Sequence, residues 1–241
     1  MTGAMLRVVA SLILTLGMLP LWAQPAPART DAGAVQDTMA QRMQACVICH
    51  GREGLASNQG YFPRIAGKPA GYLYNQLQNF KLGRRKYEAM NHLVQHLSDD
   101  YLRDIANYFA ELDLPYPAAQ ATRLTPTEQR TAERLVLRGA PERGIPACTS
   151  CHGQQMAGML PGMPGLLTLP ADYLIAQLGS WRAGQRKAKQ PDCMADVAKA
   201  LAPEDVSVVA KWLSAQTLPS GTKPAPSAGQ PLPMPCGSGG Q

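Results

Sequence analysis

Aromatic side chains are scarce in this sequence. They make up 6% of its 241 residues, and only three are Phe and three are Trp. A chain of this length is long enough for one large domain or for two domains of roughly a hundred residues each. Because so few bulky rings leave little material for two cores, we expect something besides side chains to fill them.

Charge and long apolar segments are also limited. Charged residues make up 17% of the chain, below the average of roughly 25% in globular proteins. The hydrophobic fraction of 45% is nevertheless that of a globular chain. After the N-terminal region, no segment approaches the length of a transmembrane helix.

The N-terminus has the layout of a secretory signal peptide. Arg7 is followed by an apolar run from Val8 to Leu19 and by small residues that end at Ala23. We therefore predict a signal peptide over residues 1–23 and a periplasmic location. The alternative is a retained membrane anchor, because the apolar run can be extended to Trp22. Export places the chain in an oxidising compartment, where free thiols need a reason to exist.

The chain contains a tandem duplication. The stretch ACVICHG, residues 45–51, returns as ACTSCHG, residues 147–153. The sequences that follow can be laid over each other in the same order. The pairs are YFPRIAG (61–67) with MLPGMPG (159–165), YLYNQLQNFKLGRR (72–85) with YLIAQLGSWRAGQR (173–186), and the segments that start at Ala89 and Cys193.

Both copies are predicted to be nearly all helical, since no run alternates with the period of a strand. Ser98 and Pro203 are plausible helix starts that precede acidic residues. A second helix is expected from Tyr72 to Leu82, with Gly83 as its stop. The closing segment of each copy carries apolar residues at helical spacing, namely Leu102, Ile105, Ala106 and Phe109, and Val206, Val209, Ala210 and Leu213.

Proline and glycine mark the domain boundaries. Residues 113–126 carry three prolines and separate the copies as a linker. We predict one domain over residues 31–117 and a second over 118–218. Residues 219–241 form a tail rich in Pro, Gly and Ser, which cannot bury enough apolar surface to fold alone.

The repeated cysteines and histidine indicate covalent haem. A Cys-x-x-Cys pair alone also fits a disulfide redox motif, a zinc site or an iron–sulfur site, but a His directly after it is typical of c-type haem attachment. The two thiols form thioethers with the vinyl groups, and the His binds the iron. The predicted cofactors are two haem c groups held by Cys46, Cys49 and His50 and by Cys148, Cys151 and His152.

The sixth iron ligand is predicted to be methionine, whose thioether favours ferrous iron. Met90 and Met194 occupy equivalent places before the closing helices, and this recurrence singles them out among the 11 methionines. The alternative role for any one methionine is core filler. In the first copy His92 and His96 are rival ligands, but neither recurs in the second copy.

The chain resembles the dihaem class I c-type cytochromes of the cytochrome c4 type, over roughly residues 36–218. The resemblance rests on the two Cys-x-x-Cys-His-Gly motifs, the Pro-x-x-x-Gly segments at Pro63 and Pro161, the YLxxQL helices and the two methionines. It implies an all-α protein with two tandem cytochrome c domains, each wrapped around a haem and packed about a pseudo-twofold axis. It also implies that the carbonyl groups of Pro63 and Pro161 hold the iron-binding histidines.

Two further cysteines and the long tail depart from that family pattern. Cys193 and Cys236 are left over, and in an exported protein such a pair suggests a disulfide that closes a loop of about forty residues. Two free thiols are the alternative, because sequence alone does not fix connectivity. The basic runs KLGRRK (81–86) and RAGQRKAK (182–189) suggest a docking surface for an acidic partner; the alternative is that they lie near haem propionates or simply face solvent.

These features predict an electron carrier rather than an enzyme, working between redox partners such as a respiratory dehydrogenase and a terminal oxidase. A narrower version is the cytochrome subunit of a particular dehydrogenase. A dihaem peroxidase is the competing enzyme class, and it would need an open iron position. The haem propionates offset much of the net charge of +6, so nucleic-acid binding is not expected; association with the membrane would be peripheral, or through a retained anchor.

Overall fold

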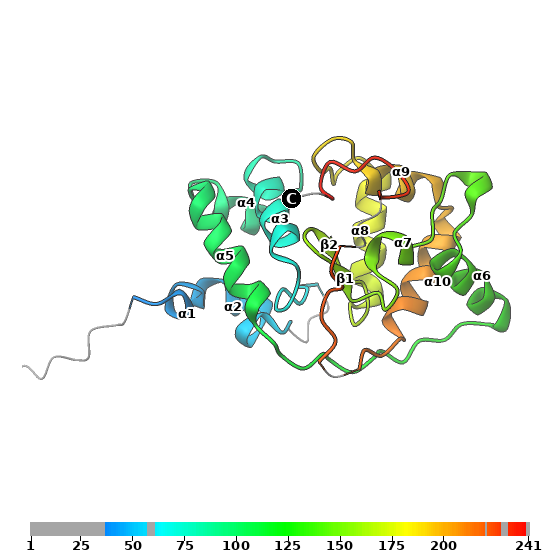
Figure 1. Ribbon diagram of the computed structural model, residues 1–241, viewed down its shortest axis with the longest axis horizontal. Helices are drawn as coiled ribbons and strands as arrows, with labels where there is room; N and C mark the ends of the chain where they lie inside the picture. Colours follow the sequence, from blue (N-terminus) through cyan, green and yellow to red (C-terminus); the bar gives the residue numbers. More distant parts are fainter. Residues whose placement is uncertain (1–36, 57–60, 220, 228–230, 240–241) are drawn as a thin grey trace, which may run out of the picture. The chain divides into compact units, whose positions relative to one another are not determined.

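The computed structural model describes residues 37–56, 61–219, 221–227 and 231–239 (Figure 1). These residues belong to one compact unit that begins at Asp37. The predicted signal peptide over residues 1–23 lies outside the described residues. In the part of the chain that is described, no helix has both the length and the apolar character needed to cross a membrane.

The secondary structure follows the duplication. The first copy contains α1 (Met39–Arg42), α2 (Gln44–His50), the 3₁₀ turn η1 (Arg52–Gly54), α3 (Ala70–Lys81), α4 (Glu88–Val94) and α5 (Asp99–Glu111). The second contains α6 (Pro126–Leu137), the 3₁₀ turn η2 (Pro141–Arg143), α7 (Thr149–His152), α8 (Ala171–Arg182), α9 (Cys193–Ala200) and α10 (Pro203–Ser214). The all-α prediction is confirmed, with one small addition. Strands β1 (Gly158–Met159) and β2 (Met163–Pro164) form a short antiparallel hairpin.

The first core lies between the two long helices of the first copy. The predicted apolar stripe of α5 is buried there, and Phe109 and Leu102 are 2% and 0% exposed. Leu73 and Phe80 of α3 pack against this stripe. The helix α5 begins where the sequence indicates, because the Ser98 hydroxyl accepts a hydrogen bond from the Tyr101 amide.

The second core is built in the same way, and helix α6 also packs on it. Val206, Val209 and Leu213 of α10 pack with residues of α8 and with Leu135 of α6. Helix α10 begins at Pro203, which needs no hydrogen-bond partner for its nitrogen at that position. Each copy therefore has its own buried cluster of apolar side chains.

The C-terminal tail is fastened at several points. Lys223 forms an ion pair with Asp113 at 2.8 Å, and Ala225 pairs with the backbone beside Met159. A disulfide joins Cys193 in α9 to Cys236, which confirms the pairing suggested by the leftover cysteines. In Figure 1 the tail, coloured orange to red, runs past the hairpin and α9.

Candidate functional site

Each cysteine–histidine motif ends a short helix. Helix α2 ends at His50 and α7 ends at His152, and the glycine that follows has a φ of 76° at Gly51 and 82° at Gly153. These are left-handed backbone angles that glycine adopts without strain. A β-carbon at Gly51 would also collide with the Ala56 carbonyl. The glycine of each motif therefore lets the chain turn sharply away after the histidine.

Both histidines are held by a backbone carbonyl. The Nδ1 atom of His50 donates to the Pro63 oxygen at 2.9 Å, and that of His152 donates to the Pro164 oxygen at 2.7 Å. A carbonyl can only accept, so the proton lies on Nδ1 and leaves Nε2 free to bind a metal. Burial lowers the pKa of both rings, which favours the neutral form that a metal ligand needs.

The expected role of Pro161 is wrong. Pro161 lies in the connection between β1 and β2, and Pro164 provides the carbonyl instead. Gly67 and Thr168 are equivalent positions of the two copies, since both have left-handed φ angles, of 70° and 64°. This alignment pairs Pro63 with Pro164. The β1–β2 hairpin shifts the Pro-x-x-x-Gly segment of the second copy along the chain. Pro161 therefore matches Pro63 in the sequence but not in the structure.

One continuous cavity of about 510 Å³ collects the predicted site residues. It is lined from both copies, and its lining includes all eight of them: Cys46, Cys49, His50, Met90, Cys148, Cys151, His152 and Met194. Met90 lies in α4 and Met194 lies in α9, the equivalent short helices. The rival ligands His92 and His96 are exposed and do not line the cavity.

Buried donors without partners suit the carboxylates of a porphyrin. The Trp181 Nε1 and the Ser238 Oγ are buried without a hydrogen-bond partner in the described structure, and both residues line the cavity. An unpaired buried donor costs roughly 1–3 kcal/mol, so such groups are expected to meet an acceptor. The described residues contain no cluster of three or more His, Cys, Asp or Glu side chains that would hold a metal ion by itself. The residues present therefore fit haem better than a bare metal.

Two arginines join the copies beside the cavity, in a cluster that we call the junction: Gln76, Arg85, Tyr173, Gln177 and Arg186. The Arg85 guanidinium donates to the Tyr173 hydroxyl at 3.0 Å and to the Gln177 amide oxygen at 2.9 Å. The Arg186 guanidinium donates to the amide oxygens of Gln177 at 2.6 Å and Gln76 at 2.8 Å. Burial, with repulsion from Arg85, lowers the pKa of Arg186 to about 10, so it stays charged at neutral pH.

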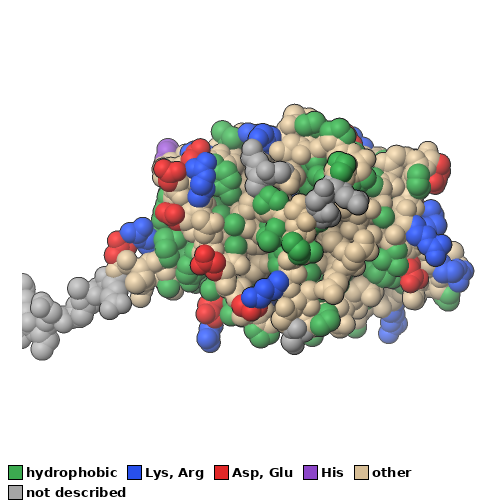
Figure 2. Space-filling view, in the orientation of Figure 1, with side chains coloured by type: hydrophobic (Ala, Val, Ile, Leu, Met, Phe, Trp, Pro, Cys, Tyr) green, Lys and Arg blue, Asp and Glu red, His purple; other side chains and the backbone are tan. Residues whose placement is uncertain are grey.

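The basic runs divide in the structure: Arg186 is buried at the junction, whereas Lys86, Lys187 and Lys189 are exposed. Arg186 is 5% exposed, and neither junction arginine has an ion-pair partner in the described part of the chain. Lys81 and Arg182, at equivalent positions, also turn inward and donate to the carbonyls of Leu97 and Leu201. On the face drawn in Figure 2, basic and acidic side chains are interspersed. These arginines therefore suit buried propionates better than an acidic protein.

The helical fold and the two cysteine–histidine motifs on one cavity define a dihaem c-type cytochrome of class I. The chain belongs to the cytochrome c4 family. It is 33% identical to cytochrome c4 from Pseudomonas aeruginosa over 209 residues, which cover 86% of this chain and 97% of that protein. Its cofactors are two covalently attached haem c groups, and it is an electron-transfer protein.

Other relatives carry a more specific name. Two proteins called thiosulfate dehydrogenase electron acceptor match the chain. The one from Thiomonas intermedia is 36% identical over 222 residues, covering 92% of this chain and 95% of its own length. The one from Stutzerimonas stutzeri is 37% identical over 171 residues, covering 70% and 78%. No protein-family model matches the chain.

Solved structures agree on the architecture. Reduced recombinant cytochrome c4 from Pseudomonas stutzeri superposes with a TM-score of 0.64 at 30% identity, covering 74% of this chain and 96% of that one. A thiosulfate dehydrogenase from Marichromatium purpuratum superposes with a TM-score of 0.62 at 28% identity, covering 70% of this chain and 36% of that one.

Proposed function

We propose that this cytochrome accepts single electrons from a thiosulfate dehydrogenase and passes them to a further respiratory acceptor. One observation carries the choice of donor. The relatives named as electron acceptors of that enzyme are 37% and 36% identical to this chain, whereas the cytochrome c4 relatives reach 33%. A free carrier that serves several donors is the broader alternative.

We assign the predicted site residues to two haems in the two domains, residues 31–117 and 118–218. Cys46, Cys49, His50 and Met90 hold the first haem, and Cys148, Cys151, His152 and Met194 hold the second. The recurrence of all four residue types in one cavity supports this assignment. When bound, each haem supplies an iron that cycles between the ferric and ferrous states by one electron.

The protein side chains orient and shield these groups rather than make or break bonds. The carbonyls of Pro63 and Pro164 fix the two imidazoles, and Met90 and Met194 would supply the second protein ligand of each iron. A peroxidase needs an open iron position for its substrate, so the paired methionines favour a carrier over an enzyme. The junction arginines and the free donors of Trp181 and Ser238 are suited to hold the propionates.

The continuity of the cavity supports transfer between the domains. Residues of both copies line the same cavity, so the two sites share one space beside the junction. We propose that an electron enters at one domain, crosses at the junction and leaves from the other domain. We place this activity in the periplasm, reached through the signal peptide over residues 1–23.

The donor is tested by mixing the purified holoprotein with thiosulfate and a thiosulfate dehydrogenase and following the visible spectrum. We expect rapid reduction of both haems, and none without the enzyme or without thiosulfate. A cytochrome c4 from an organism that lacks the enzyme is the matched control, and it should be reduced at least tenfold more slowly, about 1.4 kcal/mol in the barrier. Equal rates for the two cytochromes would reject the specific donor and leave a general carrier.

A further inference from the structure

A buried lysine of the first domain reaches into the second. Lys68 is 6% exposed and directly precedes Pro69, the N-cap of α3. Its ammonium donates to the Gly165 carbonyl at 2.8 Å. A lysine is almost never fully buried unless it is paired, yet no carboxylate forms an ion pair with Lys68 in the described residues. When protonated, the side chain therefore places a positive charge in the protein interior with no carboxylate of the described residues paired to it.

This charge lies beside the segment that positions one haem ligand. Gly165 follows Pro164, whose carbonyl accepts the hydrogen bond from His152 Nδ1. The ammonium is thus one residue away from the group that orients this imidazole. Burial lowers the pKa of His152, and the nearby positive charge of Lys68 lowers it further, so the two side chains interact electrostatically.

The first domain has no lysine at the equivalent position; the cation beside its histidine is Arg85, which adds to the effect of burial in lowering the pKa of His50. In the register set by Gly67 and Thr168, the position of Lys68 is occupied in the second copy by Leu169. The position of Gly165 is occupied in the first copy by Arg64. The Arg64 guanidinium is turned to the linker instead, where it donates to the carbonyls of Leu114 and Pro115 at 2.7 Å each. The two domains are therefore electrically different at this point.

We propose that Lys68 of the first domain raises the reduction potential of the second haem relative to the first. Uptake of one electron lowers the charge at the iron by one unit, and a nearby buried cation stabilises that reduced state. No proton or bond changes in this step. Lys68 acts through its charge, and its hydrogen bond to the Gly165 carbonyl holds that charge beside the segment that orients His152. The inference rests on the proposed assignment of His152 as an iron ligand.

The test is a redox titration of the dihaem holoprotein followed by visible spectra. Burial and repulsion from Arg64 lower the pKa of Lys68 to about 7. The titration is therefore done at about pH 5.5, where the side chain is charged. The variants are Lys68→Met, Lys68→Gln and Lys68→Arg, with Leu169→Met as the matched control at the equivalent position. Met194→His marks which step belongs to the second haem, because it lowers that step alone.

We expect Lys68→Met and Lys68→Gln to lower the potential of the second haem and to leave the first unchanged. At a fixed potential near the wild-type midpoint, the reduced fraction of the second haem should fall severalfold. Lys68→Arg should keep the wild-type value, and Leu169→Met should change neither haem. Lys68→Gln keeps a hydrogen-bond donor, so a wild-type value for this variant would overturn the role of the charge.

Two other outcomes would also overturn the inference. One is an equal shift of both haems, and the other is no shift in either neutral variant. If Lys68→Met does not yield a dihaem protein, Lys68→Gln and Lys68→Arg still compare a neutral with a charged side chain. Failure of the proposed function would look different. The wild-type protein itself would carry fewer than two haems, or the dehydrogenase would not reduce it.

Discussion

Met90 and Met194 carry the largest predicted effects among single residues. Replacing either one by alanine should remove the sulfur-to-iron absorption band of one haem, so about half of the total band intensity disappears. The potential of that haem should also fall, because the thioether stabilises ferrous iron. Visible spectra of the oxidised protein and a redox titration measure both effects.

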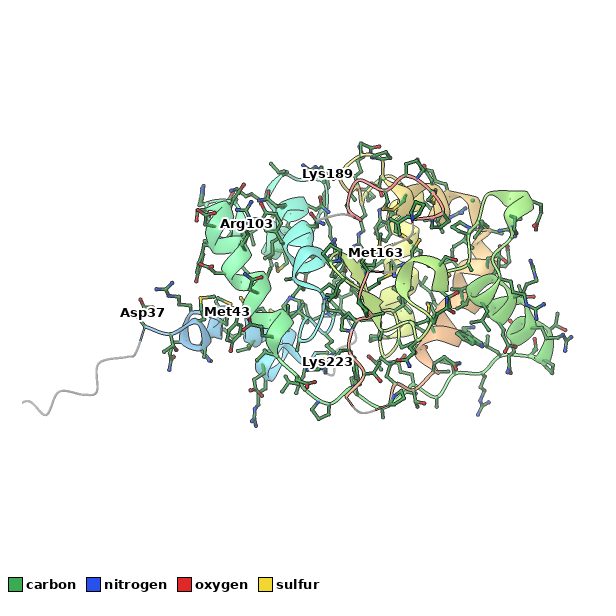
Figure 3. The ribbon with its side chains drawn as sticks, viewed as in Figure 1. Asp37, Met43, Arg103, Met163, Lys189 and Lys223 are labelled. Carbon is green, nitrogen blue, oxygen red and sulfur yellow. A yellow bond between two sulfur atoms is a disulfide. The ribbon has the colours of Figure 1, made fainter. Side chains whose placement is uncertain are left out.

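Two other methionines of the same cavity serve as controls. Met43 and Met163, labelled in Figure 3, line the cavity in the first and second copy and are 2% and 7% exposed. Met43→Leu and Met163→Leu preserve volume and should keep the whole band. An unchanged band in Met90→Ala, or a band lost in Met43→Leu, would contradict the assignment.

The sequence predicted the residues that line the cavity but not those that act on them from the other domain. A Cys-x-x-Cys-His motif fixes its own chemistry through local spacing, and the duplication selected the methionines. Lys68 and the junction arginines appear in sequence only as basic residues. Their roles depend on which carbonyl or amide of the other copy lies opposite, and this is decided by tertiary packing.

Helix α5 carries a testable prediction at the scale of elements. Ser98→Ala removes the hydroxyl that accepts from the Tyr101 amide, and should lower the free energy of unfolding by about 1 kcal/mol. Ser98→Asp keeps an acceptor at the N-cap and should retain wild-type stability. Denaturant unfolding followed by circular dichroism measures the difference. Equal midpoints for Ser98→Ala and the wild type would show that this cap contributes nothing.

Long helices were predictable and short elements were not. The stripes of α5 and α10 span several turns, so their period can be recognised. Helices α1 and α7 have only four residues, too few to display a period. The β1–β2 hairpin is equally short, and in the second copy it displaces Pro161 from the position that Pro164 fills.

At the scale of the whole molecule, the disulfide and the tail ion pair fasten the same segment with different strength. The disulfide closes a loop of 43 residues, which gives it a stabilising effect of up to about 4 kcal/mol in the chain-entropy model. The double variant Cys193→Ser with Cys236→Ser should therefore unfold at a lower temperature and become sensitive to proteolysis in the tail. Calorimetry and limited proteolysis measure these effects.

The exposed ion pair between Lys223 and Asp113 provides the control. Its side chains are 66% and 59% exposed, so Lys223→Gln should change the stability by no more than about 1 kcal/mol. Both variants should keep the absorption band of the Met194 haem. If the double serine variant were as stable and as resistant to proteases as the wild type, the disulfide would not be what holds the tail.

The Cys193–Cys236 bond also sets a condition on biosynthesis. The 6 cysteines of the chain need two different reactions. Four have to remain thiols until they add to the vinyl groups, and two have to be oxidised to a disulfide. A wrong disulfide between Cys193 and a motif cysteine would prevent one thioether from forming. It would also leave the tail without its own disulfide. A cell that makes this protein therefore needs both a reductant for the motif cysteines and an oxidant for Cys193 and Cys236.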